Sequence, residues 1–113
     1  MRICFDLDNT LCTGKPYAEA EPYSWAAPLL ESLKEKGYII IIYTARNMNT
    51  SNGNIGLVNK NVGMLTFSQL EAWGFKYDEI YFGKPAADIY IDDKGFKFKS
   101  EVELKLKLME FIK

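Results

Sequence analysis

The sequence contains no histidine among its 113 residues. Without an imidazole the chain cannot form a Ser-His-Asp triad, a Cys-His pair, an HExxH zinc site or a phosphohistidine intermediate. Any general acid, general base or nucleophile must therefore be a carboxylate, a hydroxyl, a thiol or a lysine.

Cysteine is also scarce, with Cys4 and Cys12 as the two examples. Their spacing is not that of a metal site, and the amino-terminal sequence does not resemble an export signal. We therefore expect a cytoplasmic protein with reduced thiols, in which Cys4 lies in the core of a buried strand and Cys12 lies beside the acidic segment Asp6–Thr10.

No excess of either charge is present, because 14 Lys and Arg balance 15 Asp and Glu. This balance argues against a dedicated surface for nucleic acid or an anionic membrane. The longest apolar run, residues 38–43, is far shorter than the ~20 residues of a membrane-spanning helix. A chain of this length is expected to form one domain, residues 1–113, with a single core.

Short apolar runs alternate with segments of helical periodicity along the chain. The predicted strands are Arg2–Asp6, Tyr38–Tyr43, Glu79–Phe82 and Ile89–Ile91. The predicted helices are Ser24–Lys36, Lys60–Trp73 and a last one that begins with the capping box Ser100–Glu103, while Arg46–Gly56 is predicted to be loop. This alternation predicts an α/β fold, a three-layer doubly wound and mostly parallel sheet.

Three details of this prediction can be tested residue by residue. Ser24 is predicted to be the N-cap of its helix. The run 38–43 is predicted to be buried on both faces of the sheet, because it is continuously apolar. The last helix is predicted to place Leu104, Leu108, Phe111 and Ile112 on one face.

Chemically reactive side chains follow each predicted strand. Asp6 and Asp8 end the first strand, Thr44-Ala45-Arg46 the second, Lys84 the third and Asp92-Asp93 the fourth. The carboxyl ends of parallel strands meet at one edge of the sheet, where such folds bind ligands. Residues two apart on an extended chain point the same way, so Asp6 and Asp8 are both expected to face this crevice.

Carboxylates that converge in this way repel one another unless a cation lies among them. A hard divalent ion such as Mg²⁺, with carboxylates, a backbone carbonyl, waters and a phosphate oxygen as ligands, suits the cluster. With a metal and a lysine to neutralise a phosphoryl group, one carboxylate can act as nucleophile and another as general acid and then base.

The order and spacing of these elements resemble the haloacid dehalogenase-like phosphohydrolase superfamily over nearly the whole chain. The resemblance implies a Mg²⁺-dependent phosphatase with Asp6 as nucleophile and Asp8 as acid and base. It implies that Thr44 and Lys84 hold the phosphoryl group. It also implies that Asp6, Asp92 and the Asp8 carbonyl bind Mg²⁺, with Asp93 as a water-mediated ligand or an orienting neighbour.

The segments YTARNMNTSNGNIG, YDEIYFGKP and YIDDK more closely resemble the small, capless phosphatases of this superfamily that are associated with capsular polysaccharide biosynthesis. The implied substrates are phosphorylated sugars or related small phosphomonoesters. We expect the substrate to contact the loops after the first two strands, at Thr10, Ala45, Arg46 and Asn47.

Two features depart from the superfamily pattern. Asn9 stands where glycine is frequent, although asparagine also adopts turn and left-handed conformations. Between Phe82 and Ile89 there are six residues, fewer than the dozen that a crossover between parallel strands needs. Either one of these strands is antiparallel or irregular, or the lysine arrives by another route, so Arg46 is the alternative to Lys84 as the phosphate-holding cation.

Neither connection that could carry a cap domain is long enough for one, so the site is expected to be open. A bulky substrate or a neighbouring subunit would then cover it. The alternatives are a phosphatase that acts on nucleotides or on a phosphorylated macromolecule, and a phospho-accepting receiver domain. In receiver domains, however, the acidic pair comes first and the lysine last.

Overall fold

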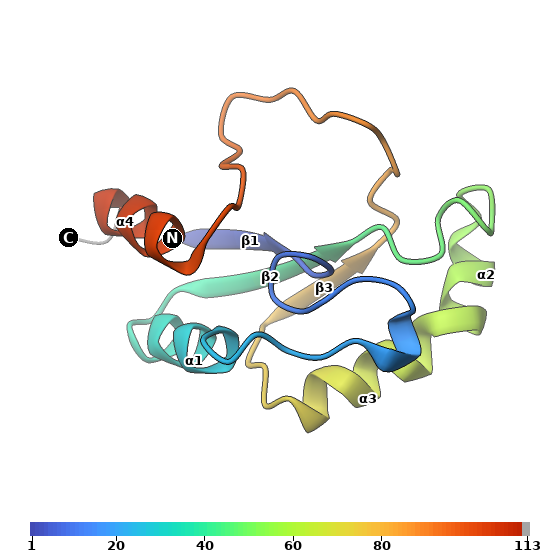
Figure 1. Ribbon diagram of the computed structural model, residues 1–113, viewed down its shortest axis with the longest axis horizontal. Coiled ribbons are helices and arrows are strands. Elements are labelled where there is room, and N and C mark those ends of the chain that lie inside the picture. Colours follow the sequence, from blue (N-terminus) through green and yellow to red (C-terminus); the bar gives the residue numbers. More distant parts are fainter. Residues whose placement is uncertain (112–113) are drawn as a thin grey trace.

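The computed structural model describes residues 1–111. In these residues, three parallel strands form a sheet that packs against helices (Figure 1). The strands are β1 (Arg2–Asp6), β2 (Ile39–Thr44) and β3 (Glu79–Phe82). The helices are α1 (Ala26–Glu35), α2 (Ile55–Val58), a π-helical stretch Asn59–Gly63, α3 (Met64–Ala72) and α4 (Glu101–Phe111), with a 3-10 turn at Tyr17–Glu19. The predicted alternation of strands and helices is confirmed as far as β3.

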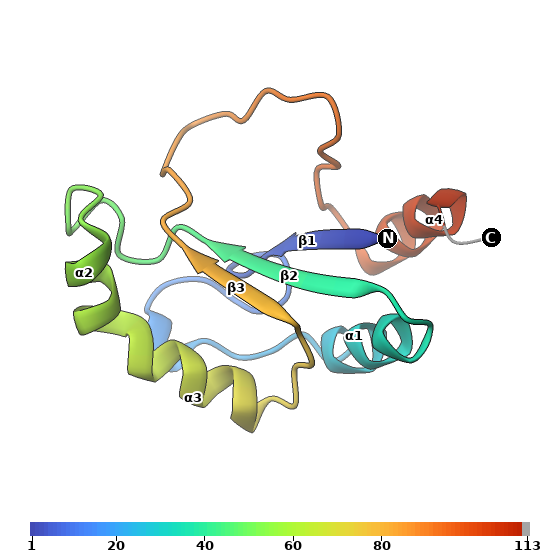
Figure 2. The same cartoon turned by 180° about the vertical axis from the view of Figure 1, so that it is seen from behind.

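The sheet has the order β1-β2-β3, and both neighbouring pairs are parallel. The register pairs Ile3 with Ile40 and Phe5 with Ile42. These four side chains lie on the same face of the sheet, and helices cover that face. Both views show α1 and α3 on the same side of the sheet (Figures 1 and 2). The core therefore lies between this face and the helices; its helical members include Leu30, Leu33, Leu70 and Leu104.

The opposite face of the sheet is largely open to solvent. Cys4 is exposed, and Ile39 and Tyr81 are 37% and 50% exposed. The prediction that Cys4 lies in the core is therefore wrong, as is the prediction that residues 38–43 are buried on both faces. Right-handed crossovers that step in one direction across a sheet place their helices on one side. The three-layer doubly wound arrangement is accordingly not confirmed.

Residues 83–100 contain no helix or strand and form the wide arc that leaves the end of β3 (Figure 2). The predicted strand Ile89–Ile91 is wrong, since Ile89 and Ile91 are 72% and 88% exposed and pair with no strand. The short connection after Phe82 explains this result, because six residues cannot cross back to the start of a parallel strand. The sequence left open whether this segment is antiparallel or irregular, and in the structure it is irregular.

The helix boundaries differ from the predicted ones at their amino ends. The helix predicted from Lys60 begins at Ile55, because Asn54 ends the loop and its side chain accepts a hydrogen bond from the Leu57 N–H at 3.2 Å. α1 begins at Ala26 after Trp25, which makes no side-chain capping bond, so the prediction of Ser24 as N-cap is wrong. Local side-chain chemistry therefore sets the start of α2, whereas α1 begins without a side-chain cap.

The last helix begins as predicted. The Ser100 hydroxyl accepts a hydrogen bond from the Glu103 N–H at 3.2 Å, which is one half of a capping box. Leu104 is buried and Leu108 packs against the core, while Phe111 is 59% exposed, so the predicted apolar face is only partly used. Ile112, the fourth predicted member, lies outside the described residues.

No cap domain is evident in residues 1–111. The chain between β1 and α1 is a loop with one 3-10 turn, and the chain between β2 and β3 is one loop and one helical segment. No helix in this part of the chain is long and apolar enough to cross a membrane. Within the described residues, no inserted domain therefore covers the carboxyl ends of the strands.

Asp78, just before β3, connects the start of β3 to β2 and to α1. Its carboxylate accepts hydrogen bonds from the Lys34 ammonium at 2.6 and 2.7 Å and from the Ile40 N–H at 2.8 Å, and these contacts hold the pKa of Asp78 below its ordinary value of 3.8. A carboxyl group whose pKa is lower in the folded state stabilises the fold at pH values above its unfolded-state pKa. This stabilisation is lost as pH falls through the folded-state pKa. Asp78→Asn should lower the urea midpoint at neutral pH, and the difference from wild type should shrink as pH falls below 3.8 and disappear below the still lower folded-state pKa. A difference that stays the same over this pH range would contradict the assignment.

Candidate active site at the carboxyl ends of the strands

A cavity of ≈ 220 Å³ opens where β1 and β2 end. Its lining combines the loop after β1, the 3-10 turn and the loop after β2; it comprises Asp6, Asp8, Lys15, Tyr17, Ala45, Arg46, Asn47, Asn49, Thr50 and Ala86. Five residues predicted for the site are therefore in the pocket wall. Lys15 and Thr50 were not predicted for the site, because nothing in the local pattern marks an exposed loop lysine or threonine as part of a site.

The end of β1 presents its two carboxylates to this cavity. Leu7 between them is fully buried, so Asp6 and Asp8 share the opposite side, as the two-residue spacing predicts. The chain then turns sharply, with the Leu11 N–H donating to the Leu7 carbonyl at 2.9 Å. Asn9 has a φ of 62°, the left-handed conformation that asparagine tolerates. Asn9 therefore satisfies the turn in place of glycine.

Lys84 lies beside the first of these carboxylates. Its backbone N–H donates to the Thr44 carbonyl at 3.1 Å, which extends the β2 to β3 pairing by one bond, and its Nζ lies 3.6 Å from Asp6 Oδ1. The ring of Tyr90 lies 4.4 Å from the same Nζ. Burial raises the pKa of Asp6 above its ordinary value of 3.8, and the Lys84 ammonium opposes this rise. The result is a half-buried carboxylate beside one fixed positive charge.

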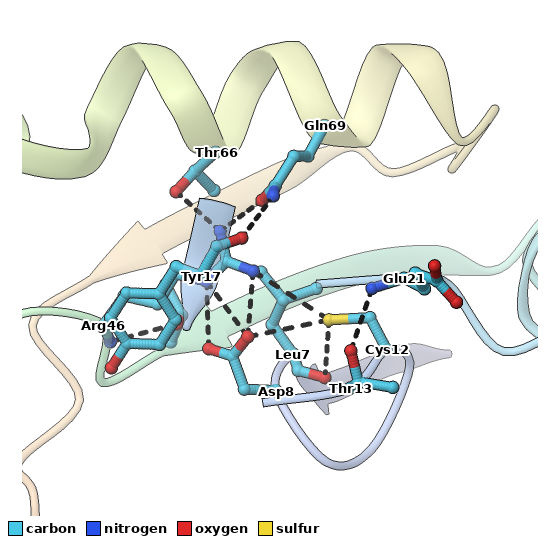
Figure 3. A network of polar contacts seen from close by, with 10 residues as sticks. Leu7, Asp8, Cys12, Thr13, Tyr17, Glu21, Arg46, Thr66 and Gln69 are labelled. Carbon is cyan, nitrogen blue, oxygen red and sulfur yellow. Dashed lines mark hydrogen bonds and ion pairs between the residues drawn. The ribbon is translucent and has the colours of Figure 1, made fainter. Parts of the chain in front are cut away.

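Arg46 is held in a different way. Its side chain is fully buried and contacts Asp8, with an Nη2 to Oδ1 distance of 2.8 Å (Figure 3). Thr66 and Gln69 of α3 accept hydrogen bonds from its Nη1 at 3.1 and 2.6 Å. Thr66 and Gln69 were not predicted for the site, although a polar pair three residues apart on the buried side of a helix is a usable signal. Lys84, rather than Arg46, is thus the cation that faces Asp6.

Asn47 belongs to a polar cluster at the start of the next loop. Its φ is 65°, and its side-chain carbonyl accepts hydrogen bonds from the Ser51 hydroxyl and from Asn61 Nδ2, the latter at 3.0 Å. The side-chain NH₂ of Asn47 is left to donate to a molecule in the cavity. Asn47 can therefore act as a hydrogen-bond donor in the pocket.

Thr10 and Thr44, also predicted for the site, do not line the cavity, and neither does Lys84, which reaches the site through its contact with Asp6. Thr10 is half-buried in the turn after β1, where its N–H donates to the Leu7 carbonyl. Thr44 is buried at the end of β2, where its hydroxyl accepts a hydrogen bond from the Arg46 N–H at 3.1 Å. In this structure Thr44 orients the start of the Ala45–Arg46 loop.

Asp92 and Asp93 are not brought to the other carboxylates. Both are exposed in the 83–100 arc, where Asp92 accepts hydrogen bonds from the N–H groups of Gly95 and Lys94, which lower its pKa below the ordinary value of 3.8. Within residues 1–111 no three His, Cys, Asp or Glu side chains are close enough to hold a metal ion. Asp6 and Asp8 supply the hard oxygen donors that Mg²⁺ prefers, but the set is incomplete in this arrangement.

The thiol nearest the site is not a nucleophile. Cys12 is buried, its Sγ lies 3.6 Å from Asp8 Oδ1, and burial together with this carboxylate raises the pKa of the thiol to about 12. The reactive form of cysteine is the thiolate, which a thiol with this pKa does not supply near neutral pH. The nucleophilic groups that line the cavity are carboxylates, hydroxyls and the Lys15 amine.

Comparison with known proteins gives one informative likeness. No family model matches the sequence, and neither does any curated protein. The crystal structure of an MCSG target from Vibrio cholerae is similar over 99% of this chain and 98% of that one, with a TM-score of 0.79 and 30% sequence identity. The description of that protein states no activity.

Proposed function

The chain belongs to the same family as the Vibrio cholerae protein, and from the site described above we propose that it is a Mg²⁺-dependent phosphatase of the haloacid dehalogenase-like superfamily. It hydrolyses a phosphomonoester through an aspartyl-phosphate. One observation supports this most directly: Asp6 and Asp8 line one cavity, and Lys84 Nζ lies 3.6 Å from Asp6 Oδ1. A carboxylate nucleophile, a second carboxylate and a cation for the phosphoryl group are the parts that such a reaction needs.

The proposed reaction has two half-reactions. Asp6 attacks phosphorus, so that a carboxylate–phosphorus bond forms and the bond to the ester oxygen breaks, while Asp8 gives a proton to the leaving alkoxide. Asp8 then takes a proton from water, which attacks the acyl phosphate and releases inorganic phosphate and free Asp6. Lys84 and the side-chain NH₂ of Asn47 are the donors proposed to hold the phosphoryl oxygens, and Thr44, Thr10 and Ala45 are proposed to shape their surroundings.

Mg²⁺ is proposed as the cofactor, with Asp6, the Asp8 carbonyl, Asp92 and Asp93 as the residues that would hold it. A bound divalent ion would offset the negative charge of the phosphoryl group and of the carboxylates around it. Since Asp92 and Asp93 lie in the arc, this ligand set requires residues 88–93 to move toward β1, which is an edge strand.

The proposed substrate is a phosphorylated sugar or a related intermediate of capsular polysaccharide biosynthesis, in the cytoplasm. The polar wall of the cavity, with Asn47, Asn49 and Thr50, supports a substrate rich in hydroxyl groups. A nucleotide or a phosphorylated macromolecule is the alternative, and a second subunit that covers the open site is part of the proposal. Turnover of a panel of phosphorylated sugars and nucleotides, with the solution mass measured in parallel, distinguishes these substrates.

A phospho-accepting receiver domain is the second candidate, because it too uses an aspartate, a threonine, a lysine and an acidic pair. The two functions differ in turnover. A phosphatase with Mg²⁺ and p-nitrophenyl phosphate releases product continuously, whereas a receiver takes up about one phosphoryl group per chain and stops. Product release that stops at one equivalent would overturn the phosphatase proposal.

Lys84→Met should weaken substrate binding and alter the pH profile. Loss of a charge-assisted contact to the phosphoryl group should raise KM at least about tenfold. Asp6 must be ionised to attack, and removing the nearby ammonium raises the Asp6 pKa further, so the acid limb of kcat/KM should move to higher pH. Lys94→Met, in the same arc, is the matched control; an unchanged acid limb in Lys84→Met would contradict the assigned contact.

A further inference from the structure

Arg46 is a charged side chain with no exposure to solvent. The exposed fraction of its side chain is 0%, and burying a guanidinium is costly unless its donors are satisfied. Residues 1–111 contain no buried side-chain nitrogen or oxygen without a partner, so this group is fully accommodated. The groups that satisfy the donors of Arg46 therefore indicate its role.

Arg46 joins three separate parts of the chain. Its Nε donates to Asp8 at 2.9 and 3.1 Å, its Nη1 donates to Thr66 and Gln69 of α3, and the Tyr17 ring lies 5.0 Å from its guanidinium carbon (Figure 3). Gln69 also donates to the Tyr17 carbonyl at 2.6 Å. Arg46 lines the cavity, but contacts on three sides fix its guanidinium, so it cannot turn further into the cavity without losing them.

The contact with Arg46 orients the Asp8 carboxylate. Its Oδ1 accepts hydrogen bonds from Arg46 Nη2 and Nε and lies 3.6 Å from Cys12 Sγ, whereas its Oδ2 accepts one, from Arg46 Nε. A carboxylate oxygen has two lone pairs, so Oδ2 keeps one for another partner. Asp8 is 16% exposed and lines the cavity. The Arg46 contact therefore fixes the plane of Asp8 while leaving one oxygen for a reacting group.

We propose that Arg46 is a positioning residue that acts through Asp8 and does not bind the phosphoryl group. The inference rests on the proposed phosphatase function. It gives Lys84 and Arg46 different roles: Lys84 faces the phosphoryl group, and Arg46 holds the carboxylate that exchanges protons with the leaving group and with water. Holding a reacting group in its productive geometry is worth large factors in rate, and this contribution appears in kcat.

The test compares the steady-state kinetics of wild type, Arg46→Lys and Arg46→Ala with p-nitrophenyl phosphate at saturating Mg²⁺. We expect kcat to fall by about 10²-fold in both variants, and KM to change by less than about threefold. Added guanidinium should restore part of kcat in Arg46→Ala by occupying the vacated space beside Asp8. Arg2→Ala is the matched control, because it removes another two-bond contact with a carboxylate, that of Glu79, on an exposed surface.

Thr66→Val provides a second variant of nearly the same shape in case the Arg46 variants do not fold. It removes one hydrogen bond from Nη1 and should lower kcat by about fivefold without changing KM. A KM that rises more than about tenfold at unchanged kcat would make Arg46 a phosphate ligand and overturn the inference. Unchanged kcat in folded Arg46 or Thr66 variants would also overturn it. A wild-type protein without turnover would overturn the proposed function and this inference together.

Discussion

Replacing Asp6 by alanine is expected to lower kcat for a phosphomonoester by at least about 10³-fold, the scale of loss when a covalent nucleophile is removed. Within the cavity, Asp6 is the carboxylate beside Lys84, and Asp8 is already engaged by Arg46. Alanine leaves no atom that could form the acyl phosphate. The measurement is product release from p-nitrophenyl phosphate, with the folded fraction checked by circular dichroism.

Glu35→Ala is the matched control for Asp6→Ala. It removes an exposed carboxylate at the end of α1, outside residues 88–93, which are proposed to carry metal ligands, so it should leave kcat unchanged. Wild-type protein quenched during turnover should carry a phosphoryl group that is labile to hydroxylamine, and Asp6→Ala should carry none. Substantial turnover by folded Asp6→Ala would reject Asp6 as the nucleophile.

Removing divalent metal is expected to lower turnover by at least about 10²-fold, because a metal contributes several kcal/mol of charge stabilisation to phosphoryl transfer. Dialysis against EDTA should remove activity, and added Mg²⁺ should restore it. Full activity in excess chelator would reject the metal-dependent mechanism while leaving the Asp6 nucleophile open to its own test.

The same experiment tests whether the arc supplies metal ligands. Asp92→Ala and Asp93→Ala should each raise the Mg²⁺ concentration needed for half-maximal activity, the direct ligand by at least about tenfold. Hydrogen exchange gives a readout apart from activity, since Mg²⁺ should protect the amides of residues 88–93 if they join β1. Wild-type Mg²⁺ dependence in both variants, with no added protection, would restrict the metal to the residues at the end of β1.

Part of the fold is predictable because its signals are local. The apolar runs that form β1, β2 and β3, and the Ser100 cap of α4, depend on neighbouring residues in the chain. The exposed Ile89–Ile91 run shows where this reasoning fails. Its composition is that of a strand, but a strand also needs a partner, and the number of residues available to reach one is a property of the whole topology.

The site shows the same division. The spacing of Asp6 and Asp8 and the positive φ of Asn9 follow from strand alternation and turn chemistry, so the sequence predicted that both carboxylates face the cavity. The different positions of Lys84, beside Asp6, and Arg46, beside Asp8, could not be predicted from the sequence. Both are cations that come directly after a strand, and only the packing of α3 against the β2 loop buries one of them.

Taken alone, the sequence determined which chemistry is available. With no histidine, the acid, base or nucleophile at this edge must be a carboxylate, a hydroxyl, a thiol or a lysine, and the alternation of β1 presents two carboxylates there, because residue type and strand alternation are fixed by the chain itself. Only the tertiary structure decided which cation faces Asp6, which one holds Asp8, and that Asp92 lies apart from both. Those positions depend on contacts between residues tens of positions apart, and their energies are set by burial and by which hydrogen-bond partners packing brings together.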